Sequence, residues 1–406
     1  MSAILEGIKI LDLTRVVAGP MCTQILADMG ASVYKIEKPG EGDDTRRMGP
    51  FLPDPATGQP SNDSALYLAY NRGKHSVTVD IATLEGAQLV RDLALRCDVV
   101  VENYKVGSLA KYGLDAASLR GLKPELIYCS VTGFGQTGPD APKPAYDFIL
   151  QGMAGPMSTC GLPDDEPGGG PMRTAIPMTD MVTGLYATIG ILGALMHRQK
   201  TGEGQVIDAA MLDATVAFNG HLAVGYLMNG KVPQRVGNTN PIASPSEVFE
   251  CAEGRIIISA GNNQQFQRMC TVLGAPDMPT DPRFATNMQR IAHRRELQAA
   301  LQTLVHGQPR ARLLEQLSAA NVPAGPLNDM AQVFTNPQTQ HRQMVVELPH
   351  SSGQTVRLVR SPLNWSASPV THKAPPRLGE HSLQALRDEL GLSDAQVAGL
   401  VARGVV

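Results

Sequence analysis

Short apolar runs alternate with amphipathic stretches through the N-terminal part of the chain. The runs at 7–13, 32–37, 76–80, 98–101 and 126–131 have the length and composition of strands, while 20–28 and 84–95 repeat with helical spacing. Strands that alternate with helices predict a doubly wound α/β sheet. Ligands of such sheets bind at the carboxyl ends of the strands, so the loops at those ends are the first place to look for a site.

The pattern changes after the last of these strands. Residues 136–178 are rich in Gly and Pro and predict a long functional loop. The apolar run Met181–Met196 has 16 residues and is interrupted by glycines and a threonine, whereas a membrane span needs about 20. It therefore predicts a buried core helix, with basic residues in its last turn and Gly202 just beyond its end. A short strand at 205–208 and a helix at 211–228 follow.

Composition shifts again after Asn229. Residues 231–246 are polar and contain proline, and a strand at 255–260 with helices at 264–273 and 294–305 predicts a smaller α+β domain. Strands are expected at 345–348 and 355–360. Residues 366–380 are Pro-rich and extended, and a last helix begins near His381.

Composition and charge exclude several classes of protein. The 406 residues are 43% apolar and 18% charged, which suits a sizeable core and excludes global disorder or a coiled coil. A net charge of −3 argues against a dedicated nucleic-acid binder. Six scattered cysteines and nine dispersed histidines lack metal-ligand spacing, so we expect no metal site. No signal peptide is seen, and we expect a cytoplasmic protein without a membrane span.

The motifs of common nucleotide cofactors and hydrolases are missing from the sequence. There is no G-x-G-x-x-G after the first strand, no Walker A lysine, no H-E-x-x-H and no G-x-S-x-G. The first turn, Val17-Ala18-Gly19-Pro20, could hold an anionic group on a helix N-terminus, although the local sequence favours an ordinary tight turn.

Asp180 is the most informative single residue. It lies at the start of the apolar helix, where the local sequence favours a helix N-cap. The helix dipole and backbone N–H groups would keep a carboxylate ionised there. An ionised carboxylate in a water-poor pocket can instead act as a covalent nucleophile toward an acyl group.

Two small basic clusters allow two interpretations each. Arg46-Arg47 follows Gly42-Asp43-Asp44, and Arg72 and Lys74 lie within 71–75 just before a strand. Each cluster is either a solvated surface or a recognition site for phosphates or carboxylates. Residues 261–266 favour a helix cap, and Cys129 and Ser130 favour core positions on a strand.

Taken in order, segments along nearly the whole chain resemble the class III coenzyme A transferases. The matching segments are 7–14, 18–20, 30–39, 42–45, 71–74, 98–104, 132–135, 138–139, Asp180 with its helix, 200–205, 323–326 and 378–381. Residues 42–46, 178–181 and 260–266 carry a narrower likeness to the succinate–hydroxymethylglutarate branch, which exchanges coenzyme A (CoA) among short dicarboxylates.

The resemblance implies a fold and an assembly. It implies a Rossmann-like large domain with a parallel sheet and a smaller inserted α+β domain. We place the first part of the large domain at 1–225, the small domain at 226–330, and a C-terminal segment that returns to the large domain at 331–406. An interlocked homodimer is also implied.

The resemblance also implies a reaction and its residues. Asp180 is the expected nucleophile in transfer of CoA from an acyl-CoA, succinyl-CoA being the expected donor, to a free dicarboxylic acid. CoA is then a co-substrate, and no tightly bound cofactor is expected. The residues expected to contact CoA or the reacting carbonyl are Val17, Ala18, Lys38, Arg72, Lys74, Asn103, Tyr104, Lys143 and Tyr146. One of Arg46 and Arg47 is expected to hold the distal carboxylate of the acid, because a guanidinium suits a carboxylate, with Arg173 as the next choice.

Two alternatives stay open at this point. An acyl-CoA racemase of the same family carries a His directly before an Asp, but here the segment reads Ala145-Tyr146-Asp147. A catalytically silent CoA-binding protein would be expected to lack Asp180 in its full context. The glycine-rich run of formyl- and oxalyl-specific transferases is missing at 236–240, and the first turn carries Val17 instead of their Gln.

Overall fold

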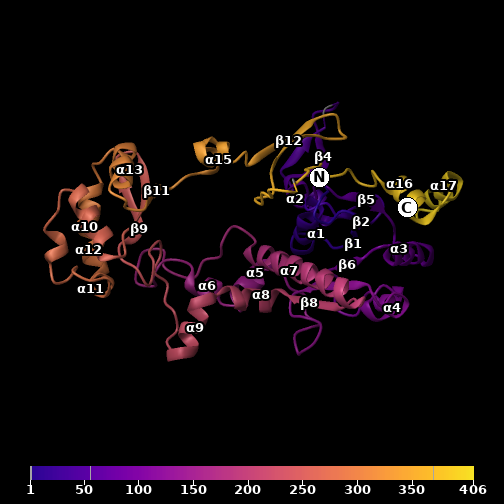
Figure 1. Ribbon diagram of the computed structural model, residues 1–406, viewed down its shortest axis with the longest axis horizontal. Coiled ribbons are helices and arrows are strands. Elements are labelled where there is room, and N and C mark those ends of the chain that lie inside the picture. The colour runs from indigo at the N-terminus through magenta and orange to yellow at the C-terminus, as the bar shows by residue number, and fades with distance from the viewer. Residues whose placement is uncertain (1, 55, 369) are drawn as a thin grey trace. The chain divides into compact units, whose positions relative to one another are not determined.

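The computed structural model describes residues 2–54, 56–368 and 370–406, and its largest element is a parallel six-stranded sheet (Figure 1). The strand order is β5-β2-β1-β6-β7-β8. Renumbered within the sheet, this is the 3-2-1-4-5-6 order of dinucleotide-binding folds, whose order reverses between β1 and β6. The predicted α/β class is confirmed. The strands are β1 (Lys9–Leu13), β2 (Ser32–Glu37), β5 (His75–Thr78), β6 (Val99–Glu102), β7 (Ile127–Thr132) and β8 (Val206–Ala210).

Helices cover both faces of this sheet, which is why its central strands read as continuous apolar runs. Every residue of β6 and β7 is buried. Adjacent strand residues point to opposite faces. Ile10 therefore packs with Leu26 of α1 and Ile191 of α7, whereas Leu11 packs with Val90 of α3 and other residues of the second core.

The helices of this part of the chain vary in length from one turn to seven. They are α1 (Ala18–Asp28), α2 (Ala65–Tyr70), α3 (Leu84–Arg96), α4 (Ala116–Leu122), α5 (Asp147–Met153), α7 (Met178–Thr201), α8 (Met211–Phe218), α9 (Gly220–Asn229), α15 (Pro337–His341), α16 (Ser382–Leu390) and α17 (Asp394–Ala402). Helix α6 (Pro156–Thr159) belongs mostly to the smaller unit described below. Short 3-10 turns lie at Asp44–Arg47 and Ala110–Tyr112, and two-stranded sheets are formed by β3 (Phe51–Pro53) with β4 (Pro60–Ser64) and by β12 (Val345–Pro349) with β13 (Thr355–Val359).

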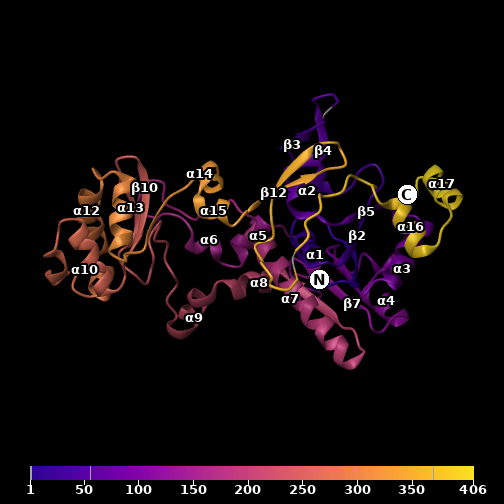
Figure 2. The same cartoon turned by 45° about the horizontal axis from the view of Figure 1, so that its top comes forward.

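The C-terminal helices return to the edge of the sheet. Figure 2 shows α16 and α17 beside α3, and the Thr78 N–H of β5 donates to the Ser382 hydroxyl at 2.9 Å. Leu386 of α16 is fully buried in the core that Leu11 also occupies. The C-terminal segment thus completes one face of the large sheet.

Helix α7 is the long apolar helix expected from the sequence. It has 24 residues, and by length and composition alone it could cross a membrane. In the fold, half of its most apolar window is buried, and the helix packs against α1, β7 and β8 as a core helix does. It ends at Gly202, which has a left-handed backbone, as predicted.

Two predicted elements differ from the structure. The segment 136–178, expected to be a loop, contains α5 and α6. These helices are short, and the many glycines and prolines around them obscure their pattern in the sequence. The single helix expected over 211–228 is divided into α8 and α9 at Asn219 and Gly220. Asn219 donates its side-chain amide to the Ala154 carbonyl at 2.8 Å, a contact with a distant segment that the local pattern could not reveal.

The chain divides into two compact units. The first contains Met1–Pro156, Thr174–Gly230 and Gln338–Val406, and the second contains Met157–Arg173 and Lys231–Pro337. Residues 157–173, expected in the large domain, group with the smaller unit. That unit has an antiparallel sheet in the order β11-β10-β9 and its own core around Phe249, Phe266 and Leu297. Its elements are β9 (Ser246–Cys251), β10 (Gly254–Ser259), β11 (Ala324–Pro326), α10 (Asn263–Val272), a 3-10 turn (Met278–Thr280), α11 (Asn287–Ala292), α12 (Arg294–Val305), α13 (Arg310–Ala319) and α14 (Met330–Thr335).

Candidate active site

A cavity of about 330 Å³ lies at the carboxyl ends of β1, β6 and β7 and contains Asp180 in its wall. We call it the Asp180 cavity. Its position at the reversal of strand order is where open α/β sheets bind ligands. Its other walls come from the turn after β1, the loops after β6 and β7, and the segment before α5, with Arg15, Val16, Ala18, Asn103, Tyr104, Lys105, Thr132, Lys143 and Tyr146 among the lining residues.

Asp180 is the third residue of α7 and does not cap that helix. The cap is supplied from α5, because the Asp147 carboxylate accepts hydrogen bonds from the Thr179 N–H and hydroxyl at 2.8 and 2.7 Å. The local interpretation of Asp180 as an N-cap is therefore wrong. Since Asp147 caps the helix, the Asp180 side chain is free to face the cavity.

Helix α7 approaches α1 closely just beyond Asp180. A Cβ atom on Gly184 would lie 2.7 Å from the Ala18 carbonyl oxygen, so only glycine permits this packing. Ala18 is the first residue of α1, and its N–H has no acceptor within the helix. The close approach brings this N–H toward the Asp180 carboxylate.

The electrostatics of Asp180 favour its neutral form more than the sequence suggested. Burial raises its pKa to about 7, the negative charge of Asp147 adds to this, and the Ala18 N–H acts in the opposite direction. Contrary to the expectation of a fully ionised carboxylate, the group is poised between its two protonation states at neutral pH. A raised pKa of this kind, in a cleft, is typical of functional carboxylates.

Tyr70 is a neighbour of Asp180 that the sequence analysis missed. It is the last residue of α2, and its pKa is raised by burial and by the negative charge of Asp180. No sequence motif contains Tyr70, and it lies 110 residues before Asp180 in the chain, so only the folded structure shows that the two are neighbours.

A second, basic hollow adjoins the Asp180 cavity. It encloses about 510 Å³ and shares Arg15, Asp44, Tyr104 and Lys105 with the cavity. Three more cations line it, Lys35, Lys38 and Lys111, and Lys111 lies 4.6 Å from the centre of the Tyr112 ring. Five carboxylates also line the space: Glu37, Glu41, Asp43, Asp44 and Asp80. Among the residues that the structure describes, no carboxylate pairs with Lys105 or Lys111. We call this second space the basic hollow.

Six of the predicted ligand-contacting residues lie in these two spaces. Ala18, Asn103, Tyr104, Lys143 and Tyr146 line the Asp180 cavity, and Lys38 lines the basic hollow, where it pairs with Glu41. Val17 is buried between its two neighbours. The Asn103 side chain is bound to the protein itself, since it accepts from the Arg15 N–H at 2.9 Å and donates to the Arg15 carbonyl at 2.7 Å.

Arg72 and Lys74 do not line either space, so the structure gives no support to their predicted contact with CoA phosphates. Arg72 is buried and donates to both oxygens of Asp28 and to the Val359 carbonyl. The Lys74 ammonium is fully buried and lies 2.9 Å from the Asp12 carboxylate. Both cations are therefore paired with buried carboxylates of the protein itself.

The predicted role of Arg46 or Arg47 in holding a distal carboxylate also lacks geometric support. Arg46 is buried against both oxygens of Glu37, at 2.7 and 2.8 Å, and stacks on the Tyr67 ring at 3.6 Å. Arg47 is half exposed, outside the Asp180 cavity, and binds Asp44 and the Glu41 carbonyl. Each guanidinium group is thus already paired with a carboxylate of the fold, Arg46 with Glu37 and Arg47 with Asp44.

Arg173, the next choice for the distal carboxylate, belongs to the second unit. The helix cap expected over 261–266 lies there too: Asn262 caps α10 by accepting from the Gln265 N–H at 2.8 Å. Within the described residues no group of three or more His, Cys, Asp or Glu side chains is arranged to hold a metal ion.

Arg15, Lys105 and Lys111 are site residues that the sequence analysis overlooked. Arg15 follows β1, and Lys105 follows β6, the two strands between which the order reverses. The rule that ligands bind at this point could have identified the first two. Lys111 could be identified only from the structure, because it lies in the turn Ala110–Tyr112, well beyond the end of β6.

Comparison with known proteins gives a consistent result. The sequence profile described as CoA-transferase family III matches residues 5–382. A succinate–glutarate CoA-transferase of Agrobacterium fabrum is 45% identical over 95% of both chains, and a human succinyl-CoA:glutarate CoA-transferase is 38% identical over 99% of this chain and 90% of its own.

A solved structure agrees with these sequences. The crystal structure of a CAIB/BAIF family protein from Brucella suis superposes with a TM-score of 0.85 at 41% identity, covering 96% of this chain and all of that one. Together with the profile match over nearly the full length, this shows that the chain is an enzyme of the CoA-transferase class and belongs to CoA-transferase family III.

Proposed function

We propose that this enzyme transfers CoA from succinyl-CoA to a short dicarboxylic acid such as glutarate, through a covalent intermediate on Asp180. The observation that carries the proposal is a partly buried carboxyl group without a cationic partner among the described residues, which accepts from the first N–H of α1 in the wall of a cavity. The names of the relatives, both of which use glutarate, support the choice of acids.

The reaction exchanges one thioester for another and needs neither ATP nor a metal ion. An Asp180 oxygen attacks the thioester carbonyl carbon of succinyl-CoA, the C–S bond breaks, and a mixed anhydride and CoA thiolate form. The thiolate attacks the Asp180 carbonyl carbon, which releases succinate and leaves an aspartyl-CoA thioester.

The acceptor acid runs the same steps in reverse. Its carboxylate attacks the aspartyl thioester, the C–S bond breaks, and a second mixed anhydride and CoA thiolate form. The thiolate then attacks the acceptor's acyl carbon, giving the new acyl-CoA and free Asp180. No proton is gained or lost, because carboxylates and thiolate act in turn as nucleophile and leaving group.

Each addition places negative charge on a carbonyl oxygen. The Ala18 N–H is our candidate donor for that oxygen, since it is fixed in the first turn of α1 and faces Asp180. A preorganised donor of this type is worth about 10²- to 10³-fold in rate. Removal of the Asp180 proton before the reaction is favoured by the same N–H.

The proposed path of CoA follows the two connected spaces. The thioester lies in the Asp180 cavity, and the phosphates lie in the basic hollow near Lys105 and Lys111, with Lys38 beside them. Tyr104 and Arg15 stand where the spaces meet, and the Arg15 guanidinium lies 5.4 Å from the centre of the Tyr104 ring.

For the distal carboxylate of the acid we propose Arg15 in place of Arg46 or Arg47. Arg15 lines the Asp180 cavity, is about half exposed, and has one guanidinium nitrogen 3.1 Å from Asp44. Its remaining donors suit a carboxylate. With a contribution of about 2 kcal/mol from such a charged pair, glutarate should exceed pentanoate by at least about tenfold in kcat/KM.

The test is substitution of Asp180 with a matched control. Asp180→Asn is expected to lower kcat by about 10³-fold or more, since the covalent route is lost. Asp213→Asn is the control, because Asp213 is likewise the third residue of its helix but is exposed and outside the cavity. Retention of more than about one per cent of wild-type kcat by Asp180→Asn would refute the nucleophile.

The same assay separates the two alternative functions. A racemase would exchange the Cα proton of an acyl-CoA with solvent deuterium, without any acceptor acid, and that exchange would survive Asp180→Asn. A silent CoA-binding protein would bind succinyl-CoA and show neither exchange nor transfer. Transfer to glutarate that vanishes only with Asp180→Asn is the result the proposal requires.

We also propose that the enzyme is an interlocked homodimer. Helices α5, α7, α8 and α9 all carry exposed apolar side chains, among them Ile189, which is 63% exposed, Leu227 at 80% and Met228 at 81%. Monomeric proteins rarely leave so much apolar surface in water. Leu227→Glu with Met228→Glu is expected to shift the mass in sedimentation equilibrium from dimer to monomer or aggregate, and a wild-type monomer would contradict the proposal.

A further inference from the structure

The turn between β1 and α1 has an unfavourable backbone at a residue of the Asp180 cavity. Val16 has φ of +71°, a left-handed conformation that a β-branched side chain strongly resists. Two residues later the chain presents the Ala18 N–H to Asp180. Strained backbone persists only where the surrounding structure over-determines it, so the contacts of this turn are informative.

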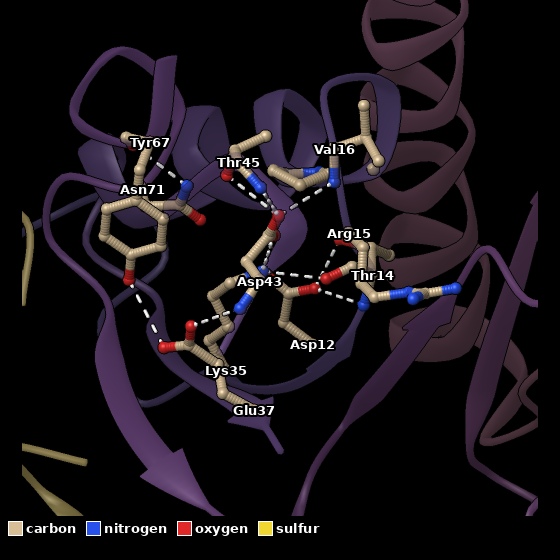
Figure 3. Close-up of polar contacts among 12 residues, drawn as sticks. Asp12, Thr14, Arg15, Val16, Lys35, Glu37, Asp43, Thr45, Tyr67 and Asn71 are labelled. Atoms are coloured by element: carbon tan, nitrogen blue, oxygen red, sulfur yellow. Dashed lines mark hydrogen bonds and ion pairs between the residues drawn. The ribbon is translucent and has the colours of Figure 1, made fainter. Parts of the chain in front are cut away.

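Side chains from four other positions bind five polar backbone groups of the turn. The Thr14 N–H donates to Asp12 at 2.8 Å, and the Thr14 carbonyl accepts from the Lys35 ammonium at 2.7 Å. Asn103 binds the N–H and the carbonyl of Arg15. The Val16 N–H donates to Asp43 at 3.3 Å, and Figure 3 shows this carboxylate directed at both Val16 and Thr45.

Three of these four side chains, those of Asp12, Lys35 and Asp43, are themselves fixed by buried ion pairs. Asp43 lies 2.9 Å from Lys35, and both side chains are fully buried. Asp12 is paired in the same way with Lys74. Lys35 and Asp43 belong to β2 and the loop after it, while Asn103 follows β6, so the turn after β1 is held from both neighbouring strands.

Resting on the proposed function, we infer that Asn103 and Asp43 are positioning residues that hold the strained turn, so that the Ala18 N–H is already directed at Asp180 when the anhydride forms. Neither residue needs to contact the reacting atoms. A donor fixed before the reaction requires no reorganisation in the transition state, which is where its value to the rate lies.

Asn103 offers the sharper test, because it is partly exposed and its removal leaves the buried ion pairs intact. If it positions the turn, Asn103→Ala lowers kcat by about tenfold and changes the KM for succinyl-CoA by less than about twofold. If Asn103 instead contacts CoA, as the sequence analysis predicted, KM rises and kcat is preserved.

A second substitution tests the strain itself. Glycine adopts the left-handed conformation without steric cost, so Val16→Gly in the Asn103→Ala protein makes the active turn accessible again. The kcat of the double variant is expected to be at least about threefold higher than that of Asn103→Ala alone. No recovery, or a kcat loss in the single variant that is matched by a KM rise, overturns the inference.

An NMR measurement on the enzyme without substrate tests the positioning role independently of the proposed CoA-transfer reaction. In protein labelled with ¹⁵N-alanine, the Ala18 amide shift is expected to titrate with Asp180 near pH 7 in the wild type. In Asn103→Ala the amplitude of this titration should fall by at least about half, and in the double variant it should return. An unchanged titration in Asn103→Ala overturns the inference, whereas a wild type that titrates correctly but transfers no CoA overturns the proposed function alone.

Discussion

Two regions at the carboxyl edge of the large sheet both contain charged side chains, yet they differ in how those charges are matched. In the first, which we call the charge network, Asp12, Lys35, Glu37, Asp43, Arg46 and Lys74 are buried and paired with one another. The second region is the Asp180 cavity with the part of the basic hollow outside this network. Here Arg15, Lys38 and Lys143 pair with surface carboxylates. Among the described residues, however, Asp180 has no cation and Lys105 and Lys111 have no carboxylate.

The two aspartates show the difference most clearly. Burial would raise the pKa of Asp12, but the charges of Lys74 and Lys35 bring it well below its usual range. Burial also raises the pKa of Asp180, and there the nearby charge is that of Asp147, so the pKa reaches about 7. A matched buried charge supports the structure, whereas an unmatched one remains available for chemistry or for a ligand.

The largest expected effect comes from breaking a matched pair. Arg72→Ala leaves Asp28 buried without its partner and should lower the free energy of unfolding by about 3–5 kcal/mol. Urea denaturation measures this, with Lys111→Ala as the control that is expected to change stability by less than about 0.5 kcal/mol. If Arg72→Ala were stable and raised the KM for acyl-CoA instead, Arg72 would belong with the ligand-binding cations.

The next prediction concerns the close contact between α1 and α7 beside the Asp180 cavity. Gly184→Ala places a methyl group 2.7 Å from the Ala18 carbonyl oxygen, so α7 and α1 must shift apart. We expect this shift to weaken the contact between Asp180 and the Ala18 N–H. Because small displacements of reacting groups are costly, kcat should fall by about tenfold to a hundredfold. Gly193→Ala on the same helix meets open space and serves as the matched control. Equal kcat values for the two variants would show that this close approach is not needed.

The pH dependence sharpens the contrast between the aspartates. Below pH 7 the ionised fraction of Asp180 falls, so kcat/KM should drop by about tenfold per pH unit and level off above pH 7. Asp147→Asn keeps an acceptor for Thr179 but removes the negative charge, and should shift this profile to lower pH. A profile without an inflection near pH 7 in the wild type would contradict the raised pKa.

Stability should depend on the same ionisation, with a determined sign. The folded-state pKa of Asp180 lies near 7, above the ordinary aspartate value of 3.8, so the folded chain binds more protons than the unfolded chain between these values. The contribution of Asp180 therefore falls as pH rises through this window. The Tm of Asp180→Asn relative to wild type should increase from pH 5 to pH 8, whereas a constant difference would indicate no shift.

The smallest expected effects belong to the cations of the basic hollow. Lys105→Ala and Lys111→Ala should each raise the KM for succinyl-CoA by about threefold to tenfold, because each removes one exposed contact with a phosphate. The ratio of rates for glutarate and pentanoate should not change. A changed ratio with constant KM would place these lysines at the acid instead of CoA.

Sequence reasoning was sufficient for the sheet, for the family and for the helix that carries Asp180. Alternating strands and helices gave the α/β class, and the ordered motifs gave the family, both of which are confirmed. The burial of charged side chains and their ion pairs with distant residues could not be predicted from the sequence. Arg72 and Lys111 look equally basic in the sequence, and only the fold shows that Asp28 neutralises the first.

Other features of the site depend on the same long-range contacts. The cap that Asp147 gives to α7 joins residues 32 positions apart, and the left-handed backbone of Val16 runs against its residue type. The roles of the site residues, the dimer and the cytoplasmic location stay predictions.

Direct detection of the covalent intermediate tests the central claim most directly. The wild-type enzyme is incubated with succinyl-CoA, treated with hydroxylamine and digested, and the peptides are analysed by mass spectrometry. The account predicts a hydroxamate on Asp180, no such product in Asp180→Asn, and a full yield in Asp213→Asn. A hydroxamate on another residue, or none in wild-type enzyme that is transferring CoA to glutarate, would contradict the assignment of Asp180 as the nucleophile.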